Sequence, residues 1–334
     1  MPPFLVSFRS PVANGHTGMR RVRIGIIGAG ALGSVIGGML AEAGNDVLLV
    51  NRNRSHVEAI NRSGLTVRTD GRDRVVAVRA AIPADVGAPA DLVIVLVKSF
   101  HTAEAVSQAI GLVGPDTTAL SLQNGLGHED ILTGLIGPDR VIAGKTYVGG
   151  VALGPGHVIA SVADKETIAG ELDGRTTPRI ESIAATFEAA GLKFVVSRNI
   201  MGAMWDKLLV NIATGALSGI TRLAYGGLYA VPELEGTAMA AVAEAIAVAK
   251  ASGIVLETLH PHDAWVKAAS GLPPEFKASM LQSLEKGSVT EVDFINGAVV
   301  RAGAKAGVPT PVNATLVACV KGIEHAGLGL AEGA

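Results

Sequence analysis

Cysteine and aromatic residues are scarce in this chain of 334 residues. The single cysteine, Cys319, excludes a disulfide framework and a cysteine-rich zinc site, and no metal site is predicted. One free thiol also fits a reducing compartment, so we expect a cytoplasmic protein. Phe, Trp and Tyr make up only 4% of the chain, so its core must consist mainly of Ala, Val, Leu and Ile.

Charged residues are also few, at 17% of the chain, whereas hydrophobic residues reach 49%. This balance excludes an intrinsically disordered chain, which needs low hydrophobicity and high net charge. The 28 basic and 30 acidic residues give a net charge of −2. Because there is no basic excess to neutralise a phosphate backbone, nucleic acid is not expected as a partner.

A long uncharged run covers residues 24–41, but no membrane span is expected there. The run holds six glycines and its hydrophobic period changes midway, which is typical of a strand, a turn and a helix. Residues 1–20 do not resemble a signal peptide, because their apolar stretch is short and Arg20 and Arg21 follow it. We expect a disordered extension there, or a start codon assigned too early with Met19 as the first residue.

The length favours two domains, and the pattern of predicted elements changes near residues 195–198. Before this point strands alternate with helices, which is typical of a parallel sheet covered on both faces. The predicted helices are 31–43, 101–110 and 128–135. The predicted strands are 22–27, 46–50, 65–69, 75–79, 91–97, 117–122, 141–148 and 157–161.

After residue 198 the strand signals vanish and the apolar residues follow helical spacing. Helices are predicted over 200–217, 233–251, 291–306 and 312–325. The fold class is therefore α/β, with a Rossmann-type parallel-sheet domain over residues 21–197 and an all-helical domain over 198–330. A cleft between two such domains is a preferred place for a ligand.

The run Gly28-Ala29-Gly30-Ala31-Leu32-Gly33 matches the dinucleotide-binding pattern G-x-G-x-x-G, directly after a predicted strand and at the start of a predicted helix. In such a loop the first glycine permits the tight turn, the second lets the backbone approach a pyrophosphate, and the third lets helix and strand pack closely. The helix N-terminus then offers free N–H groups to the phosphates. We predict cofactor binding by residues 28–33; the alternative is a purely structural turn.

The residue after the second predicted strand distinguishes between nicotinamide cofactors. An Asp or Glu there binds the ribose 2′-hydroxyl of NAD, whereas this chain has Asn51-Arg52-Asn53-Arg54. A guanidinium holds a 2′-phosphate with two hydrogen bonds, so we predict NADPH/NADP as the cofactor and Arg52 as its first contact. The alternative is that Arg52 and Arg54 are solvated loop charges.

Polar residues also follow two other predicted strands. Lys98 comes directly after the strand 91–97, and Gln123-Asn124-Gly125 ends the strand 117–122. Open α/β sheets bind ligands at the carboxyl ends of their strands, so we expect Lys98 and Asn124 to face the cofactor cleft. The alternatives are a surface lysine that closes a strand and an ordinary Asn-Gly turn.

Lys207 and Asn211 lie four residues apart on the first predicted helix of the second domain, so they share one face. Apolar neighbours such as Trp205 and Leu208 take water away from the lysine, which lowers its pKa and suits it to donate a proton near neutral pH. The alternative is a lysine at the helix edge whose ammonium reaches solvent.

Two carboxylates stand at the start of the predicted helix 291–306. Thr290 and Asp293 have the spacing of a capping box, which gives Asp293 a structural role. That role does not account for Glu291, and we expect the Glu291 side chain to point into the cleft.

Together these residues resemble the ketopantoate reductase family (2-dehydropantoate 2-reductases) over residues 22–312. Six motifs in the family's order are far more specific than any one alone. They are G-A-G-A-L-G at 28–33, V-K-S at 97–99, Q-N-G at 123–125, W-D-K-L-L-V-N at 205–211, S-M-L-Q at 279–282 and T-E-V-D-F-I-N-G at 290–297.

The resemblance implies a role for each site residue. Lys207 matches the catalytic lysine that protonates the carbonyl oxygen, and Glu291 matches the carboxylate that orients the substrate and the lysine. Lys98 and Asn124 match cleft residues near the nicotinamide, and the family uses NADPH. The positions matched to substrate contacts are Asn211, Ser279 and Asn124.

Three positions depart from the family pattern. Gly215 stands where the family often has a second asparagine for substrate hydroxyls. Tyr225 stands where an asparagine often precedes a glycine, and Ser283 where an aspartate often follows S-M-L-Q. Losing a polar partner for a substrate hydroxyl can change substrate discrimination greatly, so the reaction type is better defined than the substrate.

We therefore expect NADPH-dependent reduction of ketopantoate to pantoate, in pantothenate biosynthesis. One alternative is a related NADP-dependent oxidoreductase that acts on another 2-oxo acid or on a β-hydroxy acid. The other is a non-catalytic NADP-binding sensor, which needs the glycine loop but not Lys207 and Glu291 together. The expected partner is a small 2-oxo acid, and the Ala-rich helical domain suits the face of a homodimer.

Overall fold

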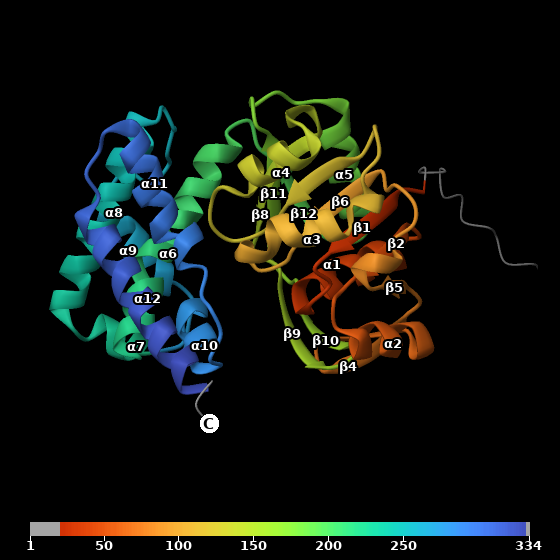
Figure 1. Ribbon diagram of the computed structural model, residues 1–334, viewed down its shortest axis with the longest axis horizontal. Helices are drawn as coiled ribbons and strands as arrows, with labels where there is room; N and C mark the ends of the chain where they lie inside the picture. The colour runs from red at the N-terminus through yellow and green to blue at the C-terminus, as the bar shows by residue number, and fades with distance from the viewer. Residues whose placement is uncertain (1–20, 332–334) are drawn as a thin grey trace, which may run out of the picture.

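The computed structural model of the chain describes residues 21–331, so the extension expected over residues 1–20 lies outside the described residues. The chain forms two halves, which lie side by side in Figure 1. The first half contains every strand of the described chain and ends at Val196, and the second begins at Ile200 and is helical. Within residues 21–331, no helix has the length and apolar character that crossing a membrane requires.

The larger of the two sheets in the first half has eight strands. These are β1 (Arg23–Ile27), β2 (Asp46–Val50), β5 (Arg79–Ala81), β6 (Leu92–Val95), β7 (Thr118–Ser121), β8 (Val141–Thr146), β11 (Glu166–Glu171) and β12 (Lys193–Val196). Their order across the sheet is β12-β11-β8-β7-β6-β1-β2-β5, and neighbours are parallel except β8 and β11. The predicted Rossmann-type, mostly parallel sheet is confirmed.

Helices cover both faces of this sheet. They are α1 (Ala31–Glu42), α2 (Arg54–Ser63), α3 (Thr102–Gln108), α4 (His128–Ile136) and α5 (Pro178–Ala189). Alternate residues of β6 show the division: Leu92 and Ile94 belong to the core that holds residues of α1 and α5, whereas Val93 and Val95 belong to the core that holds residues of α3 and α4. A strand buried on both faces needs a continuous apolar run, which is why 91–97 was visible in the sequence.

A second, smaller sheet corrects one prediction. Its strands are β3 (Leu65–Thr69), β4 (Arg72–Val76), β9 (Gly149–Gly154) and β10 (His157–Ser161), in the order β4-β3-β10-β9. The predicted single strand 75–79 is wrong, because β4 ends at Val76 in the small sheet and β5 begins at Arg79 in the large one. Asp70 and Gly71 both have positive φ, 50° and 75°, and form a tight hairpin that pairs β3 with β4.

Five helices and strands of the first half have no counterpart in the sequence prediction: α2, β9, β11, α5 and β12. Strand β9 carries glycine at three of its six positions, Gly149, Gly150 and Gly154, and glycine weakens the usual strand signal. The predicted strand 141–148 is therefore two residues too long: β8 ends at Thr146, and β9 begins at Gly149.

The second half consists of seven α-helices within the described chain. They are α6 (Ile200–Thr221), α7 (Tyr225–Tyr229), α8 (Pro232–Ala251), α9 (Pro261–Ala269), α10 (Ser279–Glu285), α11 (Asn296–Ala306) and α12 (Pro311–Ala331). Helix α6 lies at their centre and packs against α8, α9, α10 and α12. Its residues Leu208, Leu209 and Ile212 are buried, and the alanines of α8 let the helices approach closely.

The predicted helix over 291–306 is wrong at its start. A short 3₁₀ turn, Val292–Phe294, comes first, and α11 begins only at Asn296. The expected capping box between Thr290 and Asp293 does not form: the Thr290 hydroxyl donates a hydrogen bond to Glu324, and the Asp293 carboxylate pairs with Lys321. These partners come from α12, which residue spacing along one predicted helix does not reveal.

The 3₁₀ turn joins the second half to the first. The backbone N–H of Leu126 donates to the carbonyl of Phe294 at 2.9 Å, and the ring of Phe294 stacks on His128 with centroids 5.1 Å apart. Gly125 has a φ of +92°, and a Cβ there would lie 2.4 Å from the Phe294 carbonyl oxygen. A larger residue at position 125 would push the two halves apart.

Two buried titratable side chains, His128 and Glu129, lie at the start of α4. Neither ring nitrogen of His128 and only one carboxylate oxygen of Glu129 has a hydrogen-bond partner among the described residues. Burial lowers the pKa of His128 to about 4 and raises that of Glu129 to about 7. Both side chains are therefore neutral in the folded protein between pH 4 and pH 7. Their contributions to the free energy of unfolding change in opposite directions as the pH changes in this range.

These opposite shifts give a prediction for stability between pH 4.5 and 6.5. Here Glu129 contributes less stability as the pH rises, and His128 contributes more, so the two effects offset each other in the wild type. In Glu129→Gln the free energy of unfolding, relative to wild type, should rise by about 1.4 kcal/mol per pH unit, and in His128→Phe it should fall by as much. Urea unfolding at several pH values measures how the free energy of unfolding changes with pH in each variant. Equal slopes in the two variants would contradict the opposite pKa shifts of His128 and Glu129.

Candidate active site

The glycine loop has the geometry that binding a phosphate requires. Gly28 has a φ of +97°, and a Cβ on Gly33 would lie 2.4 Å from the Gly28 carbonyl oxygen, so both positions need glycine. A Cβ on Gly30 would meet no atom within 4 Å. Gly30 also precedes α1 without any side-chain cap on the helix N-terminus. The open space and the free N–H groups together form an anion-binding place.

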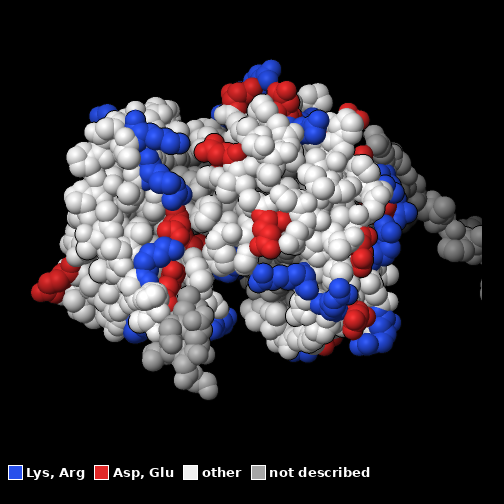
Figure 2. Space-filling view, in the orientation of Figure 1, with Lys and Arg blue, Asp and Glu red and all other residues white. Residues whose placement is uncertain are grey.

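A cleft of about 780 Å³ runs from this loop to the helical half. Figure 2 shows the molecule hollowed between its two halves, with uncharged residues over most of the visible surface. The cleft is lined by predicted site residues from both halves and by residues that the sequence did not indicate. The predicted ones are Gly28, Gly30, Ala31, Leu32, Gly33, Arg52, Lys98, Asn124, Ser279 and Glu291, and the others include His101, Glu104, Thr146 and Lys286.

Arg52 lies at the end of the cleft next to β2. Its side chain is exposed, and its Nη1 lies 3.3 Å from Nε2 of His101, whose other ring nitrogen lies 3.5 Å from Glu104. The neighbouring Asn51 also lines the cleft, and its amide donates to the carbonyl of Ala29 in the glycine loop at 2.6 Å. The segment after β2 thus carries the exposed guanidinium of Arg52 next to His101, and no carboxylate of its own.

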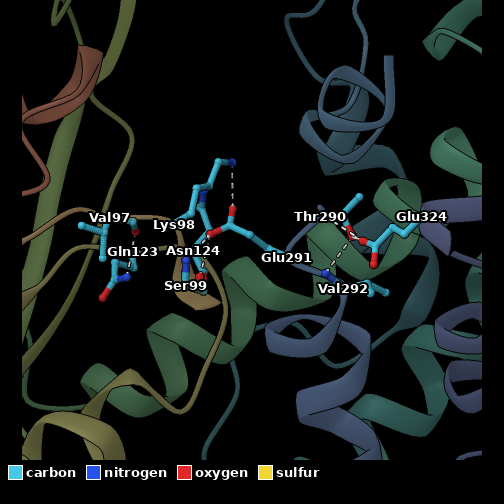
Figure 3. Close-up of polar contacts among 9 residues, drawn as sticks. All are labelled: Val97, Lys98, Ser99, Gln123, Asn124, Thr290, Glu291, Val292 and Glu324. Atoms are coloured by element: carbon cyan, nitrogen blue, oxygen red, sulfur yellow. Dashed lines mark hydrogen bonds and ion pairs between the residues drawn. The ribbon is translucent and has the colours of Figure 1, made fainter. Parts of the chain in front are cut away.

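Glu291 is the residue that brings the two halves together in the cleft. It is 8% exposed, and its carboxylate accepts hydrogen bonds from the hydroxyl of Ser99 at 2.6 Å and from the backbone N–H of Ser99 at 3.1 Å. Its other oxygen lies 3.4 Å from Nζ of Lys98. Figure 3 shows Glu291 reaching toward these two residues while Thr290 turns to Glu324.

Lys207 projects from α6 toward β8. Its ammonium donates to the carbonyl of Thr146, a residue of the cleft wall, at 2.8 Å, and lies 5.4 Å from the centre of the Tyr147 ring. Burial first, and then the charge of Lys145, lower the pKa of Lys207 to about 8, while Glu291 acts in the opposite direction. No hydrogen bond or ion pair joins Lys207 to Glu291 in the described chain.

Three predicted substrate contacts hold different places. Asn124 and Ser279 line the cleft, and the carbonyl of Asn124 accepts a hydrogen bond from the Ser99 hydroxyl at 3.1 Å. Asn211 lies one turn after Lys207 on α6 and is partly buried, outside the residues that line the cleft. One turn further, a Cβ at Gly215 would meet only the Met280 methyl group, at 3.6 Å.

The other two departures from the family pattern lie away from the glycine loop. Tyr225 is buried among the helices, and its hydroxyl lies 3.1 Å from that of Thr214. Ser283 lies on α10, where its carbonyl accepts a hydrogen bond from Ser288 at 2.9 Å. Of the three departures, Gly215 is therefore the one on the same face of α6 as Lys207 and Asn211.

Sequence reasoning missed several residues that make the site. Ser99 binds Glu291 from 192 residues away, and Thr146 supplies the acceptor for Lys207. Ser99 had a signal, because it follows Lys98 in the quoted motif V-K-S. Thr146 acts through its backbone, which leaves no mark in the sequence. Among residues 21–331, no cluster of three or more His, Cys, Asp or Glu side chains is arranged to bind a metal ion.

Comparisons with known proteins agree with this geometry. A family model described as "Ketopantoate reductase PanE/ApbA" matches residues 24–174, and its C-terminal counterpart matches residues 199–324. A 2-dehydropantoate 2-reductase of Pyrococcus horikoshii is 35% identical over 308 residues, covering 92% of this chain and 99% of that protein. One of Halobacterium salinarum is 34% identical over 301 residues, covering 90% and 98%.

Solved structures share the whole fold. A PanE/ApbA family ketopantoate reductase from Ralstonia eutropha JMP134 superposes with a TM-score of 0.83 at 36% identity, covering 91% of this chain and 99% of that one. A D-mandelate dehydrogenase solved with NADH and anilino(oxo)acetate also has a TM-score of 0.83, at 29% identity and the same coverage. With two family models that together match most of its length, the chain belongs to the ketopantoate reductase family.

Proposed function

We propose that this chain is an NADPH-dependent 2-dehydropantoate 2-reductase, which reduces ketopantoate to pantoate. The observation that carries the proposal is Lys207, an ammonium with a pKa of about 8 that donates to the carbonyl of Thr146. Thr146 lines the same cleft as the glycine loop, whereas Lys207 itself is not among the lining residues. The names of the curated relatives, 34–35% identical over about nine-tenths of this chain, support the same reaction.

The residues of the first half fit a nicotinamide dinucleotide. The open space beside Gly30 and the uncapped N-terminus of α1 suit a pyrophosphate, and the exposed Arg52 suits a ribose 2′-phosphate. We assign cofactor binding to residues 21–197 and supply of the reacting lysine to residues 198–330. When bound, the dinucleotide supplies the hydride for the reduction.

Lys207 has the chemistry of the proton donor. As a ketone is reduced, its oxygen gains negative charge, and a nearby ammonium stabilises that charge more than it stabilises the starting ketone. Lys207 then transfers a proton to the oxygen. Because the pKa of Lys207 is about 8, reduction should decline as the pH rises through 8 and the lysine loses its proton.

Glu291 and its partners have a positioning role in this proposal. The carboxylate is held by Lys98 and Ser99 of the first half, and it favours the charged form of Lys207 without contacting it. Glu291 thereby fixes the segment before the 3₁₀ turn against the cofactor half. Asn124 and Ser279 line the same cleft and are placed to bind polar groups of the substrate.

A second candidate substrate, an aromatic 2-oxo acid, is favoured by Gly215. Gly215 is buried and outside the residues that line the cleft, and it presents no polar group where the family often has an asparagine; a Cβ there would meet only the methyl group of Met280, at 3.6 Å. The TM-score of 0.83 to a D-mandelate dehydrogenase equals that to a ketopantoate reductase, which supports an aromatic 2-oxo acid as the second candidate.

The proton donor is tested by Lys207→Ala. We expect kcat for ketopantoate reduction to fall by about 10²–10⁴-fold, because the oxygen loses both its proton donor and its cation. NADPH binding, followed by the change in cofactor fluorescence, should stay within twofold of wild type. Lys305→Ala, which removes an exposed lysine of α11, is the control and should keep full activity. Wild-type turnover in Lys207→Ala would refute the assignment.

Cofactor preference is tested by Arg52→Ala. Loss of a charge-assisted contact should lower kcat/KM for NADPH by about ten- to a hundredfold and leave kcat/KM for NADH within about threefold. Arg54→Ala removes an exposed arginine at the start of α2 that does not line the cleft, so its kcat/KM values for NADPH and for NADH should both match wild type. Equal losses with both cofactors would mean that Arg52 does not contact the 2′-phosphate.

The two substrates are separated by Gly215→Asn. Initial rates of NADPH oxidation are measured with ketopantoate and with benzoylformate, the 2-oxo acid of mandelate. If Gly215 sets the preference, the variant should raise the ratio of kcat/KM for ketopantoate to that for benzoylformate by about tenfold, because an amide favours a substrate hydroxyl over a phenyl group. An unchanged ratio would place the determinant elsewhere.

A further inference from the structure

A second lysine, Lys145, ties α6 to β8 beside the reacting lysine. Lys145 lies on β8 and is only 7% exposed. Its ammonium donates a hydrogen bond to the carbonyl of Ala203 on α6 at 2.6 Å. Ala203 precedes Lys207 by four residues, which is one helical turn. Lys145 therefore fixes the turn of α6 that leads into Lys207.

Tyr147 brings the two lysines to one place. The ammonium of Lys145 lies 5.6 Å from the centre of the Tyr147 ring, and that of Lys207 lies 5.4 Å from it. Cations at this distance are attracted to an aromatic ring. The residue between, Thr146, supplies the carbonyl that Lys207 binds. Three consecutive residues thus fix Lys207: Lys145 binds the preceding turn of its helix, Thr146 offers a carbonyl and Tyr147 a ring.

The charges around the two lysines differ. Lys145 is surrounded by the carboxylates of Asp206, Glu257 and Glu166, which favour its charged form, and by the ammonium of Lys267, which opposes it. The charges that act on Lys207 are those of Lys145, on β8, and of Glu291, and the ring of Tyr147 lies beside its ammonium. The oxygens of Glu291 are already engaged with Ser99 and Lys98.

The consequence for Lys207 is a bias toward losing its proton. Repulsion from a like charge disfavours the ammonium form, and the low polarity of a buried site strengthens the repulsion. After burial, the charge of Lys145 is the next largest cause that lowers the pKa of Lys207. Burial lowers the pKa of Lys145 as well, and the nearby carboxylates act against that shift by favouring its charged form.

We propose that Lys145 is a positioning residue for the reaction: through the Ala203 carbonyl and the shared Tyr147 ring it fixes Lys207, and through its charge it makes Lys207 a stronger proton donor. The role in the reaction rests on the proposed function, whereas the coupling between the two lysines is a property of the protein alone.

The main test is the pH dependence of kcat for NADPH-dependent reduction. In wild type the rate should fall on the alkaline side near pH 8. Lys145→Met removes the charge and keeps most of the chain length, so the alkaline fall should move upward by on the order of one pH unit. Lys145→Arg keeps the charge, and the pH of the alkaline fall should stay within about 0.3 pH units of wild type. Lys145→Gln, which keeps a hydrogen-bond donor, replaces Lys145→Met should that variant not fold.

The matched control is Lys267→Met. Lys267 lies near Lys145, but it is not among the charges that act on Lys207, so its removal should leave the alkaline fall in place. An equal shift in Lys267→Met and Lys145→Met would overturn the proposal, because any nearby charge would then suffice. An unshifted profile in both uncharged variants of Lys145 would overturn it as well.

A second readout needs no substrate. Trace acetylation of the protein with acetic anhydride across pH 6–11, quantified on the peptide that contains Lys207, reports the pKa of that lysine directly. An upward move of this pKa in Lys145→Met supports the coupling even if no 2-oxo acid is reduced, in which case only the proposed function fails. Turnover of ketopantoate with an unmoved labelling pKa keeps the function and refutes the role of Lys145.

Discussion

The site depends on the burial of one helix from two sides. Helix α6 is the centre of the helical half, and it also packs against β8 and β11 of the sheet. Its apolar residues therefore cover most of its circumference, and few places remain where a charged side chain can leave it. Lys207 extends from α6 where the two halves meet. There the carbonyl of Thr146 and the ring of Tyr147 contact its ammonium in place of water. The same burial that stabilises the fold thus sets the acidity of the lysine.

Much of this arrangement was visible in the sequence. The predicted bounds of β2, β3 and β10 equal the observed ones, because the apolar residues of these strands end sharply at turn residues. The glycine loop was visible because tight turns and close approaches restrict the residue type, as the contact distances at Gly28 and Gly33 show. Family membership followed from six separate motifs, and the comparisons confirm it.

What the sequence did not indicate depends on contacts between distant segments. The small sheet pairs β3 with β10, about ninety residues later, and local periodicity carries no record of such a partner. The break before α11 arises because Thr290 and Asp293 bind side chains of α12. The partners of Glu291 come from the other half of the molecule. The roles of the site residues, the homodimer and the cytoplasmic location stay predictions.

The halves are attached at several separate places, and this has a mechanical consequence. The chain itself crosses from Val196 to Ile200, and far along the sequence the carbonyl of Phe294 is bonded to the loop before α4. In addition, α6 packs against β8 and β11, and Glu291 binds Ser99 across the cleft. A rotation of one half against the other must disturb several of these attachments at once, so the junction has the stiffness of a clamped joint and not the freedom of a simple hinge.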